Sequence, residues 1–195
     1  MRIIAGVDEA GRGPLAGPVV AAVVVLEEGQ VIEGVRDSKK LTARRREQLE
    51  TSIKAESVDW SLGIAEVMEI DLLNILGGTM LAMRRAIEGL RRMPQRLRID
   101  GNQCPELPSM YATITQTLVN GDNICPAIGA ASILAKVARD RMMVELHNQY
   151  PGYGFDRHKG YPTVAHRRAL RELGVTPAHR MSFRPVREAA ESADL

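Results

Sequence analysis

The stretch IIAGVDEAGRGPLAGPVVAAVVVLE, residues 3–27, holds two apolar runs joined by a loop of glycines and prolines. The runs, residues 2–8 and 18–26, are of strand length, and neither alternates between apolar and polar positions. Uninterrupted runs of this kind are typical of strands that are buried on both faces of a sheet. We therefore expect an α/β fold in which helices cover both sides of these strands.

Helix and strand patterns alternate along the rest of the chain. Further strands are predicted at residues 57–66, 96–100 and 111–118, and helices at residues 42–54, 69–92, 127–149 and 163–173. Gly77 and Gly78 are a weak point in the helix 69–92, which we expect to form two pieces. Two consecutive strands, followed by strands that arrive after helices, imply a mixed sheet with helices on its faces.

A loop rich in Gly, Pro and Tyr begins at Pro151 and is the one candidate boundary. It predicts a core over residues 1–149 and a basic helical segment over residues 150–195 that packs on the core. Residues 151–187 carry eight Lys and Arg against two acids, although the net charge of the chain is only +2. Such a segment suits a polyanionic partner, and a solvated basic helix face explains the same charge equally well.

The sequence carries no sign of a membrane or secreted protein. No apolar run is long enough to span a bilayer, and no signal peptide pattern stands at the N-terminus. We therefore expect a cytoplasmic protein with no membrane partner. Cys104 and Cys125 have neither CxxC spacing nor a histidine at metal-ligand spacing, so we expect two reduced thiols.

Carboxylates end two of the predicted strands. Asp8 and Glu9 close the first apolar run, and Asp100 closes the strand 96–100. If these strands are neighbours, the acids lie side by side, and Asp122 in the turn before the next helix is a candidate fourth. Such charges repel one another, and Mg²⁺ or Mn²⁺ would relieve the repulsion because both prefer oxygen ligands. Solvated surface carboxylates are the alternative reading.

The loop Gly11-Arg12-Gly13 follows the first pair of acids. Glycines let a backbone approach a ligand closely, and arginine matches the geometry of a phosphate. The spacing is not that of a dinucleotide fold, because Pro14 and Pro18 stand where a helix should begin. We therefore expect this loop to contact a nucleic-acid backbone beside the metal ions.

Six groups of residues, in the same order, resemble those of a known family. They are VDEAGRGPLAGPV (7–19), DSKKL (37–41), IDGN (99–102), GD (121–122), AASILAKVARD (130–140), and YGFDRHKGYPT (153–163) followed by HRMSF (179–183). The sequence resembles bacterial ribonuclease HII, a type 2 ribonuclease H, from about residue 3 to residue 187. Ribonuclease HIII differs at the position of Arg12 and has an extra N-terminal domain, so the resemblance favours type HII.

This resemblance implies the ribonuclease H-like fold, with a five-stranded mixed sheet flanked by helices and a small C-terminal helical appendage. It also implies an endonuclease that hydrolyses the RNA strand of RNA–DNA hybrids. The same enzyme would nick duplex DNA on the 5′ side of embedded ribonucleotides.

The resemblance also implies roles for individual residues. The family's four metal-binding, catalytic carboxylates match Asp8, Glu9, Asp100 and Asp122. Its loop that senses the ribonucleotide matches Gly11, Arg12 and Gly13. Tyr161 matches a tyrosine that stacks on the sugar at the RNA–DNA junction, and Lys39 matches a lysine near the scissile phosphate.

The expected mechanism is hydrolysis of a phosphodiester with two Mg²⁺ or Mn²⁺ ions per site in the substrate complex. Its products carry a 3′-hydroxyl and a 5′-phosphate, and we expect a monomer. Two alternatives stay open. One is a nucleic-acid-binding module of the same fold without catalysis, and the other is a different two-metal enzyme on this fold, of the resolvase or integrase type.

Backbone charge should dominate binding of the nucleic acid. The cations expected to contact phosphates are Arg157, Lys159, Arg167, Arg168 and Arg180. The histidines of the same segment, His158, His166 and His179, are expected to contact phosphate rather than metal ions.

Overall fold

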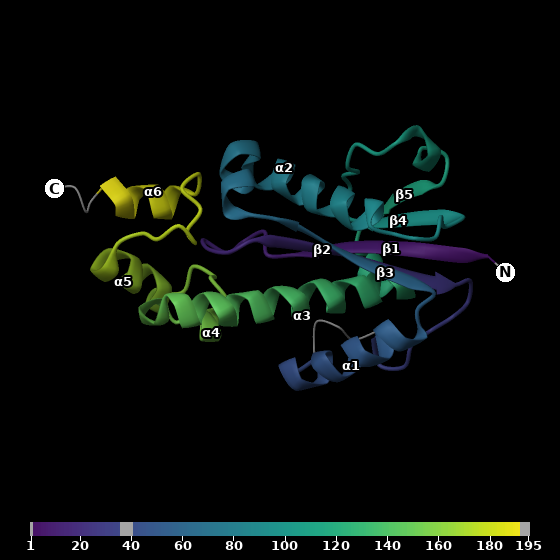
Figure 1. Cartoon of the computed structure of the whole chain (residues 1–195), viewed down its shortest axis with the longest axis horizontal. Coiled ribbons are helices and arrows are strands. Elements are labelled where there is room, and N and C mark those ends of the chain that lie inside the picture. The colour runs from purple at the N-terminus through teal and green to yellow at the C-terminus, as the bar shows by residue number, and fades with distance from the viewer. Residues whose placement is uncertain (1, 36–40, 192–195) are drawn as a thin grey trace.

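The computed structural model of the chain describes residues 2–35 and 41–191, and its centre is a five-stranded sheet (Figure 1). The strands are β1 (Ile3–Ala10), β2 (Val19–Glu27), β3 (Asp59–Ala65), β4 (Arg96–Asp100) and β5 (Thr115–Leu118). Their order across the sheet is β3-β2-β1-β4-β5, which places β1 in the middle. β2 is antiparallel to β1 and β3, whereas β4 is parallel to β1 and β5. The predicted five-stranded mixed sheet is confirmed.

Helices cover both faces of the sheet (Figure 1). One face packs against α2 (Val67–Glu88), and the other against α3 (Pro126–Gln149) and α1 (Ala43–Glu56). Side chains of β2 alternate between the two layers: Ala22, Val24 and Leu26 pack with α1 and α3, and the residues between them pack with α2. Every residue of β2 except the last is buried. The expectation of a strand buried on both faces is therefore confirmed.

The helix α2 lies so close to β3 that the strand has no room for a side chain at Gly63. An ideal Cβ on Gly63 would lie 2.0 Å from the carbonyl oxygen of Ala82 and 2.4 Å from the amide nitrogen of Ala86. Both are backbone atoms of α2, so they could move aside only with the helix itself. The packing of this layer therefore requires glycine at position 63.

A kink divides α2 at Asn74, which has φ 59° and ψ 174°. The Asn74 side-chain oxygen accepts hydrogen bonds from the amides of Leu76 at 2.9 Å and Gly77 at 3.2 Å. Asn74 thus acts as the N-cap of the second piece, a role that asparagine fills well. The sequence predicted a break at Gly77 and Gly78; the break lies earlier because Asn74 both tolerates positive φ and caps the helix.

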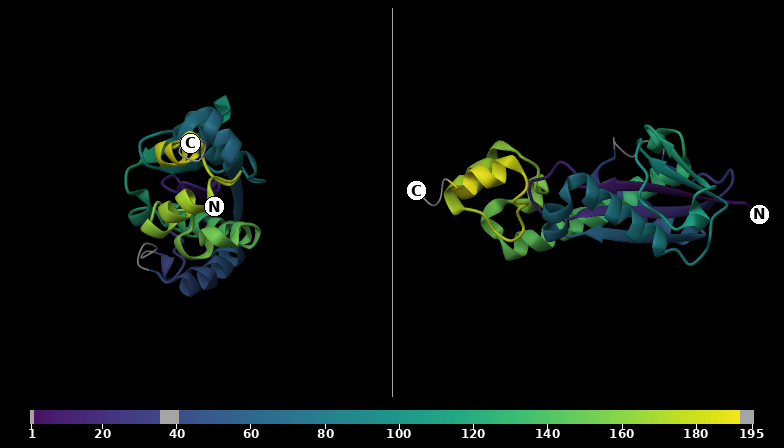
Figure 2. Two further views of the ribbon diagram at one scale, coloured as in Figure 1. Left: turned by 90° about the vertical axis from the view of Figure 1, so that its left-hand side faces the viewer. Right: turned by 90° about the horizontal axis from the view of Figure 1, so that it is seen from above.

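The C-terminal part of the chain lies at one end of the sheet (Figures 1 and 2). It contains η4 (Pro151–Tyr153), α4 (Phe155–His158), α5 (Val164–Leu173) and α6 (Arg184–Glu191). Tyr153 and Phe155 pack with Ala16 and with Met143 of α3, so this part is attached to the rest by an apolar cluster. The division at residue 149 stays a prediction. Within residues 2–35 and 41–191, none of the helices has the length and apolar character that crossing a bilayer requires.

A pair of buried histidines links α5 to the segment that follows it. His166 Nδ1 lies 3.0 Å from the carbonyl oxygen of Tyr161, which accepts a hydrogen bond, so we assign the proton to Nδ1. His166 Nε2 then accepts from His179 Nε2 at 3.1 Å, and His179 Nδ1 accepts the amide of Thr176 at 3.1 Å. Both rings are therefore neutral. Burial lowers the pKa of each ring to about 4. A neighbouring imidazole also opposes protonation of each ring: His158 acts on His166, and His166 acts on His179.

We expect the substitution Gly63→Ala to destabilise the protein by more than ~3 kcal/mol, because overpacking against helix backbone exceeds the usual cost of overpacking a core. Urea unfolding followed by circular dichroism measures the free energy of unfolding. Ser61→Ala, on the same face of β3, is the matched control because it adds no atom against α2. Equal stability of the two variants would contradict the packing argument.

We also expect the protein to lose stability as the pH falls from about 6.5 to about 4. A histidine in the unfolded chain has a pKa of about 6.5, so over this range the unfolded state binds more protons than the folded state. Urea unfolding at a series of pH values tests this. His179→Gln cannot gain the second proton, so its stability should depend less on pH over the same range. An equal pH dependence would show that the pair does not carry the effect.

Candidate active site

The carboxylates at the ends of β1 and β4 meet at one edge of the sheet. The two strands are parallel and adjacent, and their register pairs Val7 with Ile99. Asp8 and Asp100 are the next residues on these strands, so they end up side by side. Glu9 follows Asp8 in β1, opposite Ala21 of β2. The structure thus brings together three of the four carboxylates that the sequence singled out.

Asp8 is the buried member of this group, with 7% of its surface exposed. Burial raises the pKa of its carboxyl well above the ordinary value, and the negative charges of Glu9 and Asp100 raise it further. Hydrogen bonds from the Ser132 hydroxyl and from the Glu9 amide, the latter at 2.7 Å, oppose part of this shift. A carboxylate in this position gains stability from a nearby positive charge.

Asp122, the fourth carboxylate, lies in the short helix η3 (Gly121–Asn123). The Asp100 Oδ1 atom accepts a hydrogen bond of 2.6 Å from the Gly121 amide, so Asp100 holds the backbone one residue before Asp122. Asp122 is buried, and its Oδ1 accepts from the Asn123 side chain at 3.1 Å. The third and fourth carboxylates are therefore tied together through a backbone hydrogen bond.

These carboxylates form an open edge rather than a closed cage. In the described residues, no three His, Cys, Asp or Glu side chains gather closely enough to be a metal site by themselves. Mg²⁺ usually binds through one or two carboxylates, with water and substrate phosphate as its other ligands. The ionised form of Asp8 is destabilised by burial and by the charges of Glu9 and Asp100. Oxygen donors of this kind, placed near one another, fit such an ion. Asp8, Glu9, Asp100 and Asp122 are the residues that would hold it.

Two buried arginines shape the loop over residues 11–18 that follows these acids. Arg180 donates hydrogen bonds to the carbonyl oxygens of Gly11, Arg12, Pro14, Gly17 and Pro18. Arg139 of α3 donates to those of Ala16 and Pro18, and also to Lys159. Gly11 has φ +100°, and a Cβ there would lie 2.1 Å from Arg139 Nε, so the position accepts only glycine.

Both guanidinium groups are fully buried. Burial lowers the pKa of Arg139 to about 10 and that of Arg180 to about 9, so both remain charged at neutral pH. Burying a charge is costly unless its hydrogen bonds are satisfied, and here the loop carbonyls satisfy them. The carbonyl groups of the loop therefore face inward, toward the two arginines.

The amides of Arg12 and Gly13, unlike the loop carbonyls, are available to a ligand. Both residues are exposed, and in the described part of the chain neither amide donates to another protein group. The Arg12 side chain is half exposed and lies 3.3 Å from Glu9 at its nearest charged atoms. Free amides and a guanidinium beside the carboxylate edge are suitable donors for an anionic ligand.

A cavity of about 420 Å³ lies in front of this loop. It is lined by Glu9, Ala10, Gly11, Arg12, Gly13, Arg46, Ser132, Ile133, Lys136 and Tyr161. Tyr161 is 42% exposed, and its ring lies 3.5 Å from the position of a Cβ on Gly13. The structure thus places Tyr161 against the loop that precedes it by about 150 residues.

Several residues of the basic segment do not lie where the sequence predicted. Arg180 was expected to contact phosphate, yet it is fully buried and holds the loop 11–18. His166 and His179 were expected to do the same, but both are buried and bind each other. In contrast, Arg157, Arg167 and Arg168 are exposed, and Lys159 is partly so. Lys39 lies outside the described residues.

Sequence reasoning missed Ser132, Lys136 and Arg46, which all line the cavity. Ser132, Lys136 and Asp140 are spaced four residues apart in a helix of small and apolar residues, and this spacing places them on one face. That signal was available in the sequence. No such signal existed for Arg139, because a charged residue on a helix is ordinarily exposed.

Comparison with known proteins agrees with this geometry. The family model described as Ribonuclease HII matches residues 5–186, a range that contains all four carboxylates, the loop and Tyr161. A curated ribonuclease HII of Burkholderia mallei (strain SAVP1) is 58% identical over 187 residues, which are 96% of this chain and 86% of that protein.

Solved structures agree as well. The ribonuclease H2 of Pyrococcus horikoshii OT3 has a TM-score of 0.80 and 28% identity, covering 97% of this chain and 98% of that chain. The Bst-RNase HIII structure in complex with Mn²⁺ has a TM-score of 0.74 and 18% identity, covering 98% of this chain and 70% of that one, a likeness of fold. Since the family model spans most of the sequence, the chain belongs to the ribonuclease HII family and has its ribonuclease H-like fold.

Proposed function

We propose that this protein is an endonuclease that hydrolyses the RNA strand of RNA–DNA hybrids. It also nicks duplex DNA on the 5′ side of embedded ribonucleotides, leaving a 3′-hydroxyl and a 5′-phosphate. The observation that carries this proposal is one cavity that joins Glu9, the Gly11–Gly13 loop and Tyr161 beside the acidic edge of the sheet. This arrangement supplies chemistry for cutting a phosphodiester and groups for recognising the sugar next to it.

The four carboxylates are the proposed metal ligands and define the place of cleavage. Two Mg²⁺ or Mn²⁺ ions, when bound there, would lower the pKa of an attacking water and stabilise the leaving 3′-oxygen. The part of the protein is to place Asp8 beside Asp100 through the register of β1 and β4, with Glu9 next to Asp8 in β1, and to hold Asp122 near Asp100 through the bond from Gly121 to Asp100. Ligands that are already close to one another need little rearrangement when substrate arrives.

Recognition of the ribonucleotide belongs to the loop Gly11–Gly13 and to Tyr161, which line the cavity together with Glu9. The 2′-hydroxyl is the group that distinguishes RNA from DNA, and it both donates and accepts hydrogen bonds. Arg12 and Gly13 are exposed residues whose amides donate to no other protein group in the described residues, so these amides are the proposed donors for it or for the neighbouring phosphate. The Tyr161 ring, which lies against Gly13, offers a flat surface for the sugar or base at the junction.

Three labelled duplexes test this function: an RNA–DNA hybrid, a DNA duplex with one ribonucleotide, and the same duplex as DNA alone. With Mg²⁺ or Mn²⁺ we expect cleavage of the first two and none of the third. Asp8→Asn and Asp100→Asn should each reduce cleavage more than ~100-fold, because even outer residues of metal sites cost up to about that much. Normal rates in these variants would remove the metal assignment. Cleavage of the all-DNA duplex would favour a resolvase-type enzyme, and binding without any cleavage a non-catalytic module.

The role of Tyr161 is tested by two substitutions. Tyr161→Phe keeps the ring and should change kcat/KM for the single-ribonucleotide duplex less than ~3-fold, whereas Tyr161→Ala should lower it between ~5-fold and ~150-fold, the range that a stacking contact of ~1–3 kcal/mol implies. Steady-state cleavage of the single-ribonucleotide duplex measures both. Equal losses in the two variants would show that the hydroxyl, rather than the ring, makes the contact.

A further inference from the structure

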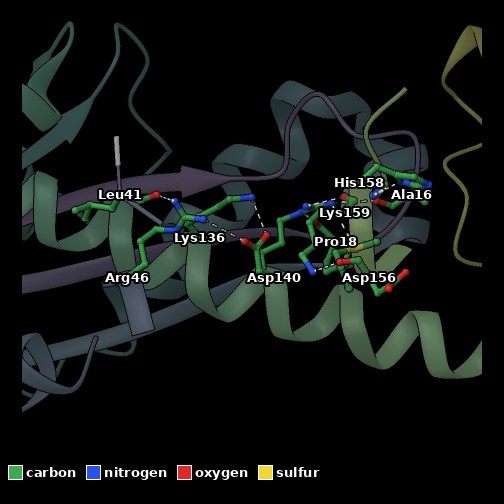
Figure 3. Close-up of polar contacts among 12 residues, drawn as sticks. Ala16, Pro18, Leu41, Arg46, Lys136, Asp140, Asp156, His158 and Lys159 are labelled. Carbon is green, nitrogen blue, oxygen red and sulfur yellow. Dashed lines mark hydrogen bonds and ion pairs between the residues drawn. The ribbon is translucent and has the colours of Figure 1, made fainter. Parts of the chain in front are cut away.

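The backbone that leads into Tyr161 does not specify its own shape. Lys159 has φ 51° and Gly160 has φ 81°, so two successive residues adopt the left-handed conformation, which a lysine rarely takes. A Cβ on Gly160 would lie 2.7 Å from the carbonyl oxygen of Ala16, and Figure 3 shows Ala16 and Lys159 near each other. Contacts from outside this stretch must therefore hold the Tyr161 ring in the cavity.

Three successive hydrogen bonds connect the Tyr161 backbone to the segment before Arg180. With the protons assigned as above, His166 Nδ1 donates to the Tyr161 carbonyl at 3.0 Å, and His179 Nε2 donates to His166 Nε2 at 3.1 Å. The Thr176 amide donates to His179 Nδ1 at 3.1 Å. We call the two rings and these three bonds the histidine chain. Both rings are buried, so water does not compete for the bonds.

Neighbouring rings fix the orientation of the His166 ring. The His158 ring stacks on it with centroids 4.6 Å apart and planes 15° apart, and the Phe155 ring meets it edge-on at 5.4 Å. His158 is itself held, since its Nε2 lies 2.7 Å from the Tyr153 carbonyl oxygen and its Nδ1 accepts the Gly160 amide at 3.2 Å. A ring that is packed in this way directs its hydrogen bond to one point.

The segment that carries His179 also holds the loop of glycines and prolines in the cavity wall. The Arg180 amide donates to the Leu15 carbonyl at 2.9 Å, and Ala16 pairs with His179 as an isolated bridge. The histidine chain therefore connects the Tyr161 backbone to the same loop that the Tyr161 ring contacts.

We propose that His166 is a positioning residue for Tyr161, which holds the ring at the ribose through its hydrogen bond to the Tyr161 carbonyl and is itself held by His179. His166 is fully buried and is not among the residues that line the cavity, so it acts on the substrate only through Tyr161. Misplacing a positioning group by about 1 Å costs up to ~100-fold in rate. This proposal rests on the proposed function, because Tyr161 acts on the substrate of that site.

Two substitutions separate the roles of the two His166 nitrogens. An asparagine amide reaches about as far as Nδ1, so His166→Asn keeps a donor for the Tyr161 carbonyl, whereas a glutamine amide reaches about as far as Nε2, so His166→Gln keeps only the partner of His179. In steady-state cleavage of the single-ribonucleotide duplex with Mg²⁺, His166→Gln should lower kcat/KM ~2-fold to ~12-fold, the range that one buried hydrogen bond implies. His166→Asn should change it less. Tyr153→Phe is the matched control, because it removes a buried hydrogen bond of 2.8 Å to the Gly174 carbonyl in the same part of the protein, and it should keep the kcat/KM of the wild type.

A double-mutant cycle shows whether His166 acts through the Tyr161 ring. In the Tyr161→Ala background the ring is gone, so His166→Gln should change kcat/KM less than ~2-fold. A general loss of stability would instead lower kcat/KM by the same factor in both backgrounds. Thermal unfolding verifies that each variant is folded at the assay temperature. If His166→Gln does not fold, His179→Asn enters the same cycle, because it keeps the acceptor for the Thr176 amide and removes the donor to His166.

The outcomes separate this proposal from the proposed function. If the wild type cleaves the duplex and the histidine variant matches Tyr153→Phe, His166 does not position Tyr161 and the proposed function stands. The same conclusion follows if the variant loses equally with and without the Tyr161 ring. If the wild type cleaves neither the hybrid nor the single-ribonucleotide duplex, the proposed function fails and the positioning role with it.

Discussion

The site depends on the hydrogen bonds by which Arg139 and Arg180 hold the carbonyl groups of the loop 11–18. The loop has few apolar side chains of its own, and glycines and prolines alone do not select one shape. Two buried positive charges do so, because each guanidinium would be left unsatisfied by any other path of the backbone. With the carbonyls turned inward, Arg12 and Gly13, whose amides donate to no other protein group in the described residues, line the cavity.

Charges of opposite sign lie next to each other at the candidate site. The acidic edge suits cations, while Arg12, Arg46 and Lys136 line the cavity beside it. On the proposed function, a polyanion that arrives with divalent cations satisfies both. Asp8 is buried and close to the like charges of Glu9 and Asp100, so a nearby positive charge stabilises its ionised form.

Much of the sheet and its helices could be predicted, because runs of apolar residues in the sequence indicate which segments are buried. Apolar runs that stop at acids predicted the strands β1 and β4. Because the structure shows that these two strands are neighbours, the same pattern also accounts for the position of Asp8 beside Asp100. Contacts between distant segments leave no such local trace: only the family resemblance linked Tyr161 to the loop. Arg180 was assigned to the surface because charged residues are rarely buried, and the loop carbonyls that bind it cannot be recognised in a sequence. The kink at Asn74 was misplaced because glycine was weighed as the breaker and the capping side chain was not.

The bond from Arg180 to the Gly11 carbonyl spans 169 positions of the chain. During synthesis, β1, β2 and α3 can form their layers well before residue 180 leaves the ribosome, since domains build up from the N-terminal side. Until then the loop has Arg139 as an anchor and lacks the second one. The carboxylates of β1 and β4 can therefore come together in the nascent chain before the second anchor of the loop is made, and on the proposed function the ability to discriminate between substrates would be completed last.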